Sequence, residues 1–307
     1  MNALILITLA IGAVALAAWW QENARAEVDD SYRQDAPGSY AQLSQGVTHY
    51  RWHGPVRGPV LVAIHGLTTP SMVWDELARG FAAFGFRVLT YDLYGRGYSD
   101  AYDGPQDAAH FVKQLEELLA DQGVEQDVSL VGYSMGGSIA TAFAAANLHR
   151  VDRLFLVASA GVETVESGFS QFCRRAGPIG SLVFATFAGP RMKRALQSDA
   201  SVLDVPGLKE HQLAQLDRRG FLPSVLDSRR GLLSDRQEAE HRAIAQRNIP
   251  VFAVWGGADA VIPVSSVGTL AKWNRSAFQD VIDGAGHALP NTHSDELMAA
   301  LRSQIHH

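Results

Sequence analysis

The sequence predicts an α/β fold, with a mostly parallel, doubly wound sheet and helices on both of its faces. Short, continuous apolar runs recur along the chain and alternate with helix-compatible stretches. Such runs are typical of strands buried on both faces, and their alternation with helices is typical of a parallel sheet. The length of 307 residues suits one large α/β domain that carries an insertion.

Composition narrows the range of partners. Hydrophobic residues make up 47% of the chain and charged residues 19%, as is ordinary for a globular protein. The net charge of −6 gives no reason to expect nucleic acid as a partner. Cys173 is the one cysteine, so no intrachain disulfide is possible, and we interpret it as a packing residue.

The chain opens with an apolar segment. The stretch from Ala3 to Trp20 carries no charge and is long enough to cross a bilayer, and its two terminal tryptophans favour the membrane interface. We therefore expect residues 1–26 to anchor the chain in a membrane by a single helix. A cleaved signal peptide with export is the alternative, because Ala24-Arg25-Ala26 has the form of a cleavage site. A buried helix of a soluble protein is a third interpretation.

The predicted elements of the first half follow in order. Residues 22–38 are polar and read as a linker, and a short antiparallel pair at 40–43 and 47–52 follows it. Strands are then predicted at 60–64, 86–91, 128–131 and 154–158, and helices from 71 to about 84, at 106–121 and at 138–147. Ser71 is a candidate cap for the first of these helices.

The alternation stops at Gly161 and resumes at Pro250. Helix-like patches without a convincing buried strand fill the interval, so we divide the chain into a first core part (27–160), a helical cap insertion (161–248) and a second core part (249–307). The second part is predicted to hold strands at 251–255 and 278–282 and helices at 264–273 and 293–304. The insertion carries 13 Lys and Arg against 10 Asp and Glu, so its surface is either simply solvated or faces anionic lipid head groups.

A serine-centred motif joins the third of these strands to its helix. Gly132-Tyr133-Ser134-Met135-Gly136 fits the Gly-x-Ser-x-Gly pattern of a nucleophile elbow. A turn that exposes a serine is strained, and small flanking residues let it form. Ser134 is therefore the candidate nucleophile. The amide of Met135, at the start of the following helix, is a candidate oxyanion donor.

A serine hydroxyl needs a base, which is usually a histidine held by a carboxylate. Reacting groups gather at the carboxyl ends of parallel strands, and Asp259 and His287 both follow predicted strands through glycine-rich loops. The order Ser134, Asp259, His287 matches one known arrangement of such triads. Asp283 is the rival acid and His293 the rival base, and Asp259 has a second interpretation as a helix cap.

Two further segments lie at strand ends. After the strand at 60–64, Leu67 is the candidate second oxyanion donor, Thr68 is the alternative, and we expect His65 to orient the loop. The segment 92–99 is dense in glycine and polar groups. We interpret it as a turn in which Asp92, Arg96 and Ser99 satisfy the backbone and one another, with Arg96 as a clamp for a substrate carboxylate as the alternative.

Taken together, these motifs resemble the α/β-hydrolase superfamily. The resemblance rests on five segments: His65-Gly66-Leu67, 92–99, Gly132–Gly137, Gly256–Asp259 and Gly284–His287. It is closest to capped serine esterases of the monoacylglycerol lipase-like kind, and it implies the α/β-hydrolase fold, a triad of Ser134, Asp259 and His287, and oxyanion donors at Leu67 and Met135. Epoxide hydrolases and haloalkane dehalogenases share that fold but have Asp at the nucleophile position.

The resulting hypothesis is a serine hydrolase that cleaves carboxylic esters through an acyl-enzyme intermediate. Carbon–carbon bond hydrolysis, thioester hydrolysis and a non-catalytic ligand-binding member of the fold are the alternatives. We expect no metal and no cofactor, since no His, Cys or carboxylate cluster has ligand spacing. Apolar residues of the insertion, Phe184 and Phe187 among them, are expected to line an acyl pocket, so the substrate would be a small, lipid-like ester with an apolar acyl group.

Overall fold

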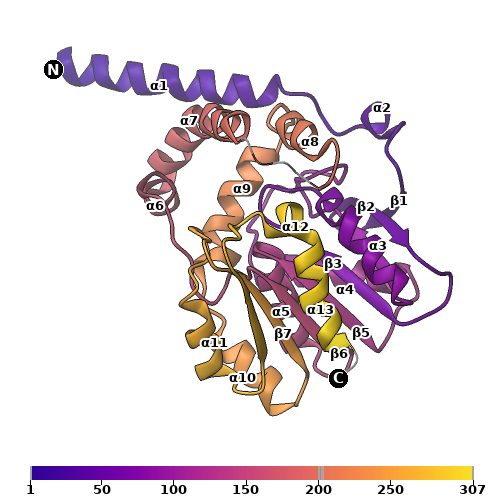
Figure 1. The fold of residues 1–307 in the computed structure, drawn as a ribbon. Coiled ribbons are helices and arrows are strands. Elements are labelled where there is room, and N and C mark those ends of the chain that lie inside the picture. The colour runs from indigo at the N-terminus through magenta and orange to yellow at the C-terminus, as the bar shows by residue number, and fades with distance from the viewer. Residues whose placement is uncertain (1, 200, 202–203, 306–307) are drawn as a thin grey trace.

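The computed structural model describes residues 2–199, 201 and 204–305, and its centre is one eight-stranded sheet (Figure 1). The strand order is β1-β2-β4-β3-β5-β6-β7-β8. β1 and β2 pair in antiparallel fashion, β2 is antiparallel to β4, and the remaining pairs are parallel. The bounds are β1 Ser39–Leu43, β2 Gly46–His53, β3 Val60–Ile64, β4 Arg87–Tyr91, β5 Val128–Tyr133, β6 Val151–Val157, β7 Val251–Gly256 and β8 Phe278–Ile282. The mostly parallel, doubly wound sheet expected from the sequence is confirmed.

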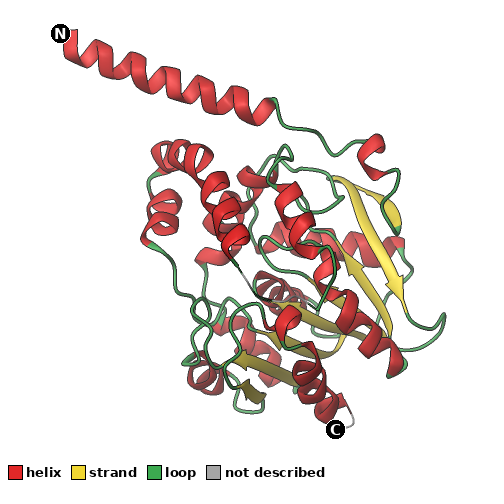
Figure 2. Ribbon diagram, turned by 45° about the horizontal axis from the view of Figure 1, so that its top comes forward, coloured by secondary structure: helices red, strands yellow, loops and turns green. Residues whose placement is uncertain are grey.

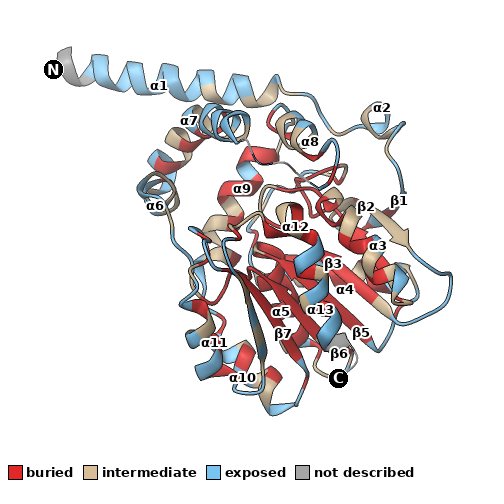
Figure 3. Cartoon of the chain, viewed as in Figure 1, coloured by how far each residue is buried: buried red, intermediate tan, exposed pale blue. Residues whose placement is uncertain are grey.

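Side chains of each central strand pack into two separate apolar layers, one on each face of the sheet, because successive residues of a strand point to opposite faces. In β3, Val62 and Ile64 pack in one layer, whereas Leu61 and Ala63 pack in the other. The first layer is covered by α4 (Ala108–Asp121), α5 (Met135–Ala146), α10 (Glu238–Gln246) and α11 (Ser266–Trp273), and the second by α3 (Asp75–Ala83) and α13 (Ser294–Ile305). Figure 3 shows the strands and the facing sides of these helices as the buried centre of the molecule.

The first predicted helix differs in how it begins. The chain forms a 3₁₀ turn, η1 (Ser71–Trp74), before α3, and the Ser71 side chain does not cap it. That expectation was wrong, because the backbone N–H of Ser71 instead donates to Asp92 Oδ1 at 2.7 Å. The predicted linker also contains a short helix, α2 (Asp30–Arg33), whose Arg33 forms an ion pair with Asp100 at 2.5 Å.

Four helices between β6 and β7 cover the carboxyl end of the sheet, and we call them the cap helices. They are α6 (Gly168–Arg175), α7 (Gly177–Ser198), α8 (Leu208–Gln215) and α9 (Phe221–Arg230). They share a small apolar core that includes Cys173, Phe184 and Phe221. The next helix, α10, packs on α5 and α11 in the layer over the sheet. The division of the chain at 160 and 248 stays a prediction.

The N-terminal helix α1 (Asn2–Asn23) lies outside the rest of the molecule, alongside α7 (Figures 1 and 2). Residues Ile5–Asn23 are long and apolar enough to cross a membrane, and none of that segment is buried in the protein. By length and composition, α1 is therefore a candidate membrane anchor or signal sequence. A buried core helix is not what the structure shows.

Candidate active site

The serine motif forms a tight turn between β5 and α5. Ser134 has φ 54° and ψ −119°, a conformation that is strained for a residue with a side chain. The flanking glycines permit it, because a Cβ atom at Gly132 would lie 2.3 Å from the carbonyl oxygen of Gly136. A Cβ at Gly136 would lie 2.0 Å from the carbonyl oxygen of Ile64. The local sequence therefore sets the serine at the carboxyl end of the sheet.

Three side chains from separate loops meet there. Ser134 Oγ lies 3.0 Å from His287 Nε2, and His287 Nδ1 lies 2.8 Å from Asp259 Oδ2. The carboxyl group of Asp259 is fully buried, and its Oδ1 accepts the backbone N–H groups of Val261 at 2.7 Å and Ile262 at 2.9 Å. Asp259 thus accepts hydrogen bonds from the turn after β7 with one oxygen and contacts the histidine with the other. The next helix, α11, has Ser265 at its N-cap, so the interpretation of Asp259 as a helix cap was wrong.

The rival acid and base lie elsewhere. Asp283 is exposed in the turn that follows β8, and His293 contacts Thr292 Oγ1 at 2.9 Å between α12 (Leu289–Thr292) and α13. The loop that carries His287 is held by the end of β5, because the Tyr133 hydroxyl donates to the His287 carbonyl at 3.0 Å. The sequence did not predict this hydrogen bond between Tyr133 and His287, because the two residues are far apart in the chain and no motif links them.

Two backbone amides flank the serine as candidate oxyanion donors. Met135 is the first residue of α5, so its N–H has no partner within the helix. On the other side, His65 is buried at the end of β3, with Nδ1 donating to the Gly66 carbonyl at 2.8 Å and Nε2 accepting the Leu93 N–H at 2.9 Å. Burial lowers the pKa of His65 to about 4, so it stays neutral and holds the loop that carries Leu67.

Arg96 does not face a substrate. Its side chain is 1% exposed, so the carboxylate clamp considered from the sequence is not available. Nε donates to the Leu67 carbonyl at 3.1 Å, and Nη2 donates to the Ser224 carbonyl at 3.1 Å and to Ser228 Oγ at 2.8 Å. Nη1 donates to the Tyr94 carbonyl and to Gln106 Oε1. Burial lowers the pKa of Arg96 to about 9. One guanidinium therefore ties the candidate oxyanion loop to cap helix α9, a link with no signal in the sequence.

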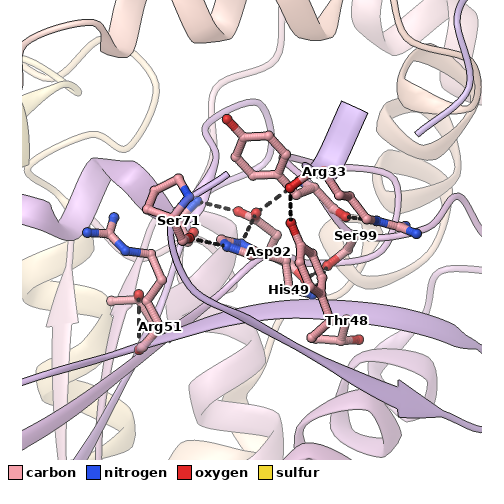
Figure 4. A network of polar contacts seen from close by, with 12 residues as sticks. Arg33, Thr48, His49, Arg51, Ser71, Asp92 and Ser99 are labelled. Atoms are coloured by element: carbon pink, nitrogen blue, oxygen red, sulfur yellow. Dashed lines mark hydrogen bonds and ion pairs between the residues drawn. The ribbon is translucent and has the colours of Figure 1, made fainter. Parts of the chain in front are cut away.

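The turn that holds Arg96 is itself fixed by Asp92 (Figure 4). Asp92 Oδ2 lies 2.8 Å from His49 Nδ1 and accepts the Tyr98 N–H, while the Ser99 hydroxyl donates to the Asp92 carbonyl. Burial alone would raise the pKa of Asp92, but the hydrogen bond and charge of His49 hold it below its usual value. Burial alone would lower the pKa of His49, but Asp92 raises it. Asp92 and Ser99 thus satisfy the backbone of the turn and each other as expected, whereas Arg96 bonds to Leu67, Tyr94, Gln106 and α9 instead.

A cavity of about 560 Å³ lies under the cap helices and reaches Thr68, next to Leu67. Its wall is mostly apolar and includes Phe184, Met192, Leu196, Phe221 and Val225, and its charged members are Arg191, Arg229 and Asp199. Phe184 is 4% exposed and lines this cavity, but Phe187 is 54% exposed and does not. Phe187 lies one turn after Phe184, about 60° around the helix axis, so it stands at the edge of the inner face of α7, where its side chain is exposed.

Comparisons with known proteins show the family to which the chain belongs. The family model described as alpha/beta hydrolase fold matches residues 59–293. A pimeloyl-[acyl-carrier protein] methyl ester esterase of Aliivibrio salmonicida is 29% identical over 262 residues, which is 83% of this chain and 95% of that protein. Lipase 1 of Psychrobacter immobilis is 28% identical over 250 residues, 78% of this chain and 74% of its own length.

Solved structures support the fold. A carboxylesterase from Bacillus subtilis has a TM-score of 0.72 at 18% identity, covering 95% of this chain and 98% of its own. An enol-lactonase from Burkholderia xenovorans has a TM-score of 0.69 at 20% identity, covering 88% and 100%. The sequence relatives hydrolyse esters by name, which supports a hydrolase. By its sequence match and its fold, the chain belongs to the alpha/beta hydrolase fold family.

Proposed function

We propose that this protein hydrolyses carboxylic esters with apolar acyl groups through an acyl-enzyme formed on Ser134. The observation that carries the proposal is the continuous contact from Ser134 Oγ through the His287 ring to the buried carboxylate of Asp259. A buried carboxylate beside Nδ1 keeps the proton on that nitrogen and leaves Nε2 free to accept the serine proton.

The reaction then follows from the positions of these groups. His287 Nε2 takes the proton of Ser134 Oγ while the oxygen attacks the ester carbonyl, and the N–H groups of Leu67 and Met135 stabilise the resulting oxyanion. The tetrahedral intermediate collapses, the C–O bond to the alcohol breaks, and His287 gives its proton to the leaving alcohol. His287 Nε2 then takes a proton from water, which attacks the acyl carbonyl. The second tetrahedral intermediate collapses, the acid leaves, and Ser134 Oγ regains its proton from His287.

The cavity under the cap helices supports an apolar acyl group. Thr68, next to Leu67, is one of its lining residues, whereas Ser134 and His287 are not, and most of its wall is apolar. Each CH₂ group of an acyl chain that leaves water there would contribute about 0.8 kcal/mol to binding. The names of the sequence relatives, a methyl ester esterase and a lipase, are consistent with this substrate class.

The test is covalent labelling and turnover in one pair of variants. Ser134→Ala should abolish labelling by a fluorophosphonate probe and lower kcat on p-nitrophenyl esters by roughly 10⁴-fold or more, with the fold intact. Ser138→Ala, on the buried side of α5, is the matched control and should keep both. Hydrolysis by the Ser134 variant at the parent rate would reject the mechanism. Failure of the parent to label would favour a non-catalytic ligand-binding protein.

We also propose that α1 anchors the enzyme in a membrane as a single span. The helix is apolar on all sides, which suits a span better than a helix lying in the interface, and Trp19 and Trp20 at its end suit the interface itself. The segment after it is part of the folded body, since Arg33 pairs with Asp100. Isolation of the mature protein cleaved after Ala26 and free of membranes would show that the segment is a signal peptide instead.

A further inference from the structure

The end of α1 is attached to the cap helices. Glu22 Oε1 accepts the N–H of Gly220 at 2.7 Å, the Ala26 carbonyl accepts the N–H of Arg219 at 2.9 Å, and Arg219 forms an ion pair with Glu27. These contacts join the segment 22–27 to the turn between α8 and α9, and we call them the latch. Because the latch begins two residues after Trp20, it lies close to the level at which a membrane-spanning α1 would leave the bilayer.

The long cap helix α7 has two different faces. Its inner face, with Phe184, Ala188 and Met192, lines the cavity. Ile179, Phe187 and Arg194 are spaced by eight and seven residues, so they lie on one side of the helix, beside the inner face rather than on it, and all three are exposed. Ile179 is 66% exposed, and Phe172 of the neighbouring helix α6 is 48% exposed. Residues 5–17 of α1 are exposed, so only the C-terminal end of this helix lies against the cap, and Figure 1 shows the rest of α1 extending past α7.

The charges within α6 and α7 have one sign, although Arg174 is paired with Glu166 just before α6 and Arg191 lines the cavity. The stretch 167–198, which holds α6 and α7, contains five arginines and lysines and no Asp or Glu. Arg175, Lys193 and Arg194 are exposed, whereas the protein as a whole carries −6. Exposed apolar side chains beside a cluster of cations fit a surface of anionic lipid, in which the apolar groups enter the bilayer and the cations meet the head groups.

From these observations we propose that the outer face of α6 and α7 docks on the anionic surface of the same bilayer that α1 enters, with the latch fixing the distance between them. The proposal rests on α1 as the anchor and is independent of the hydrolysed bond. With the cap held against the lipid, the cavity on its inner side lies one helix away from the membrane, which suits an ester substrate that partitions into lipid.

The test uses the full-length protein in vesicles of phosphatidylcholine, with or without phosphatidylglycerol. An environment-sensitive dye is placed on Ile179→Cys or, as the control, on Val56→Cys, which is 88% exposed in the loop before β3 at the opposite end of the sheet. The unmodified chain gives the labelling blank, since Cys173 is buried. Flotation measures anchoring, and quenching of the dye by nitroxide lipids measures docking.

We expect every variant to float, and the dye at position 179 to shift to the blue and be quenched, more strongly with phosphatidylglycerol, while the dye at 56 is not. Equal emission at the two positions in floating vesicles would overturn docking alone, whereas a chain that does not float would overturn the anchor and docking together. Lys193→Gln with Arg194→Gln should remove the effect of phosphatidylglycerol. Quenching that ignores this change would reject the anionic contact.

The latch is tested separately by Glu22→Ala with Arg219→Ala. This variant should still float but lose most of the quenching at position 179, because α1 would no longer hold the cap at the surface. The matched control is Glu238→Ala with Arg242→Ala, which removes an exposed ion pair of 2.6 Å on α10, outside the cap helices. Undiminished quenching in the latch variant would show that the outer face docks without the latch, and the role assigned to the latch would be wrong.

Discussion

Helices α5 and α7 belong to regions of the molecule that are built differently. In α5, which follows the serine at the carboxyl end of the sheet, ten of twelve residues are buried, whereas in the 22-residue α7 only Gly180, Phe184, Ala188 and Gly189 are. A helix packed on all sides holds its neighbours in one geometry, while a helix with a cavity on one side and solvent on the other does not. We infer that the sheet region fixes the chemistry and that the cap helices select the substrate.

The largest expected effect comes from replacing Asp259, the proposed acid of the triad. Asp259→Asn should lower kcat by roughly 10³- to 10⁴-fold, because an amide in this position favours the wrong tautomer of His287. Asp283→Asn is the matched control, because Asp283 is exposed in the loop after β8, and this substitution should lower kcat far less. Steady-state kinetics on one soluble ester suffices, and the reverse order of the two variants would make Asp283 the acid.

Arg96 links the two regions, so its replacement should affect both. Arg96→Met would release the Leu67 carbonyl and the α9 backbone together, and a shift of the oxyanion loop by about 1 Å can cost about 10²-fold in kcat. Ser228→Ala removes only a cap-side partner and should change acyl-length preference more than kcat on an acetate ester. A pure loss of thermal stability in Arg96→Met, with kcat and KM unchanged, would show that Arg96 does not position the loop.

Within the cap, substitutions of Phe184, which is buried, and Phe187, which is exposed, distinguish the roles of the two faces of α7. Phe184→Ser should reduce the preference for longer acyl chains, by up to about fourfold for each CH₂ that loses its apolar wall. Phe187→Ser should leave the acyl-length profile for soluble esters unchanged, because its side chain points outward. The measurement is kcat/KM over a p-nitrophenyl ester series. Equal effects of the two substitutions would mean that α7 turns its other face to the substrate.

The smallest expected effect concerns acid stability. Burial lowers the pKa of His65, His110 and His241 to about 4 each, so the folded protein binds fewer protons than the unfolded chain. Stability from these groups is present above their unfolded pKa of about 6.5 and is lost as the pH falls toward 4. His241→Gln should flatten this loss in denaturant titrations between those pH values. His211→Gln, in the cap, should do so less, since burial lowers the pKa of His211 but the charge of Asp92 opposes that shift.

The sequence predicted the sheet region in detail and the cap only in outline. Predicted and observed strands agree at 60–64, where a continuous apolar run is typical of a buried strand, and at 278–282, where the run is mixed but follows the helix as the alternation requires. The elbow and the two loops after β7 and β8 were recognisable because chemistry restricts their residue types. These local constraints act within a few residues, where a sequence is easiest to interpret.

What could not be predicted depends on contacts between distant segments. The apolar series of α7 shows helical spacing, but spacing does not tell which side meets a cavity, so Phe187 was placed with Phe184. The partners of Arg96 come from residues 67, 106, 224 and 228, and nothing near Arg96 in the chain marks them. Likewise, α2 is only four residues long, and besides its N-cap Asp29 it depends on contacts of Arg33 with the distant Tyr98 and Asp100.

The buried guanidinium of Arg96 has a consequence for how the molecule folds and evolves. An arginine stays charged at neutral pH, and it cannot be desolvated until all of its acceptors are in place. Some of those acceptors belong to α9. The turn after β4 can therefore bury Arg96 only when α9 has packed against it. Core and cap should therefore unfold in one cooperative transition. A chimera that exchanges the cap for that of a relative would need to supply an acceptor where Ser228 stands.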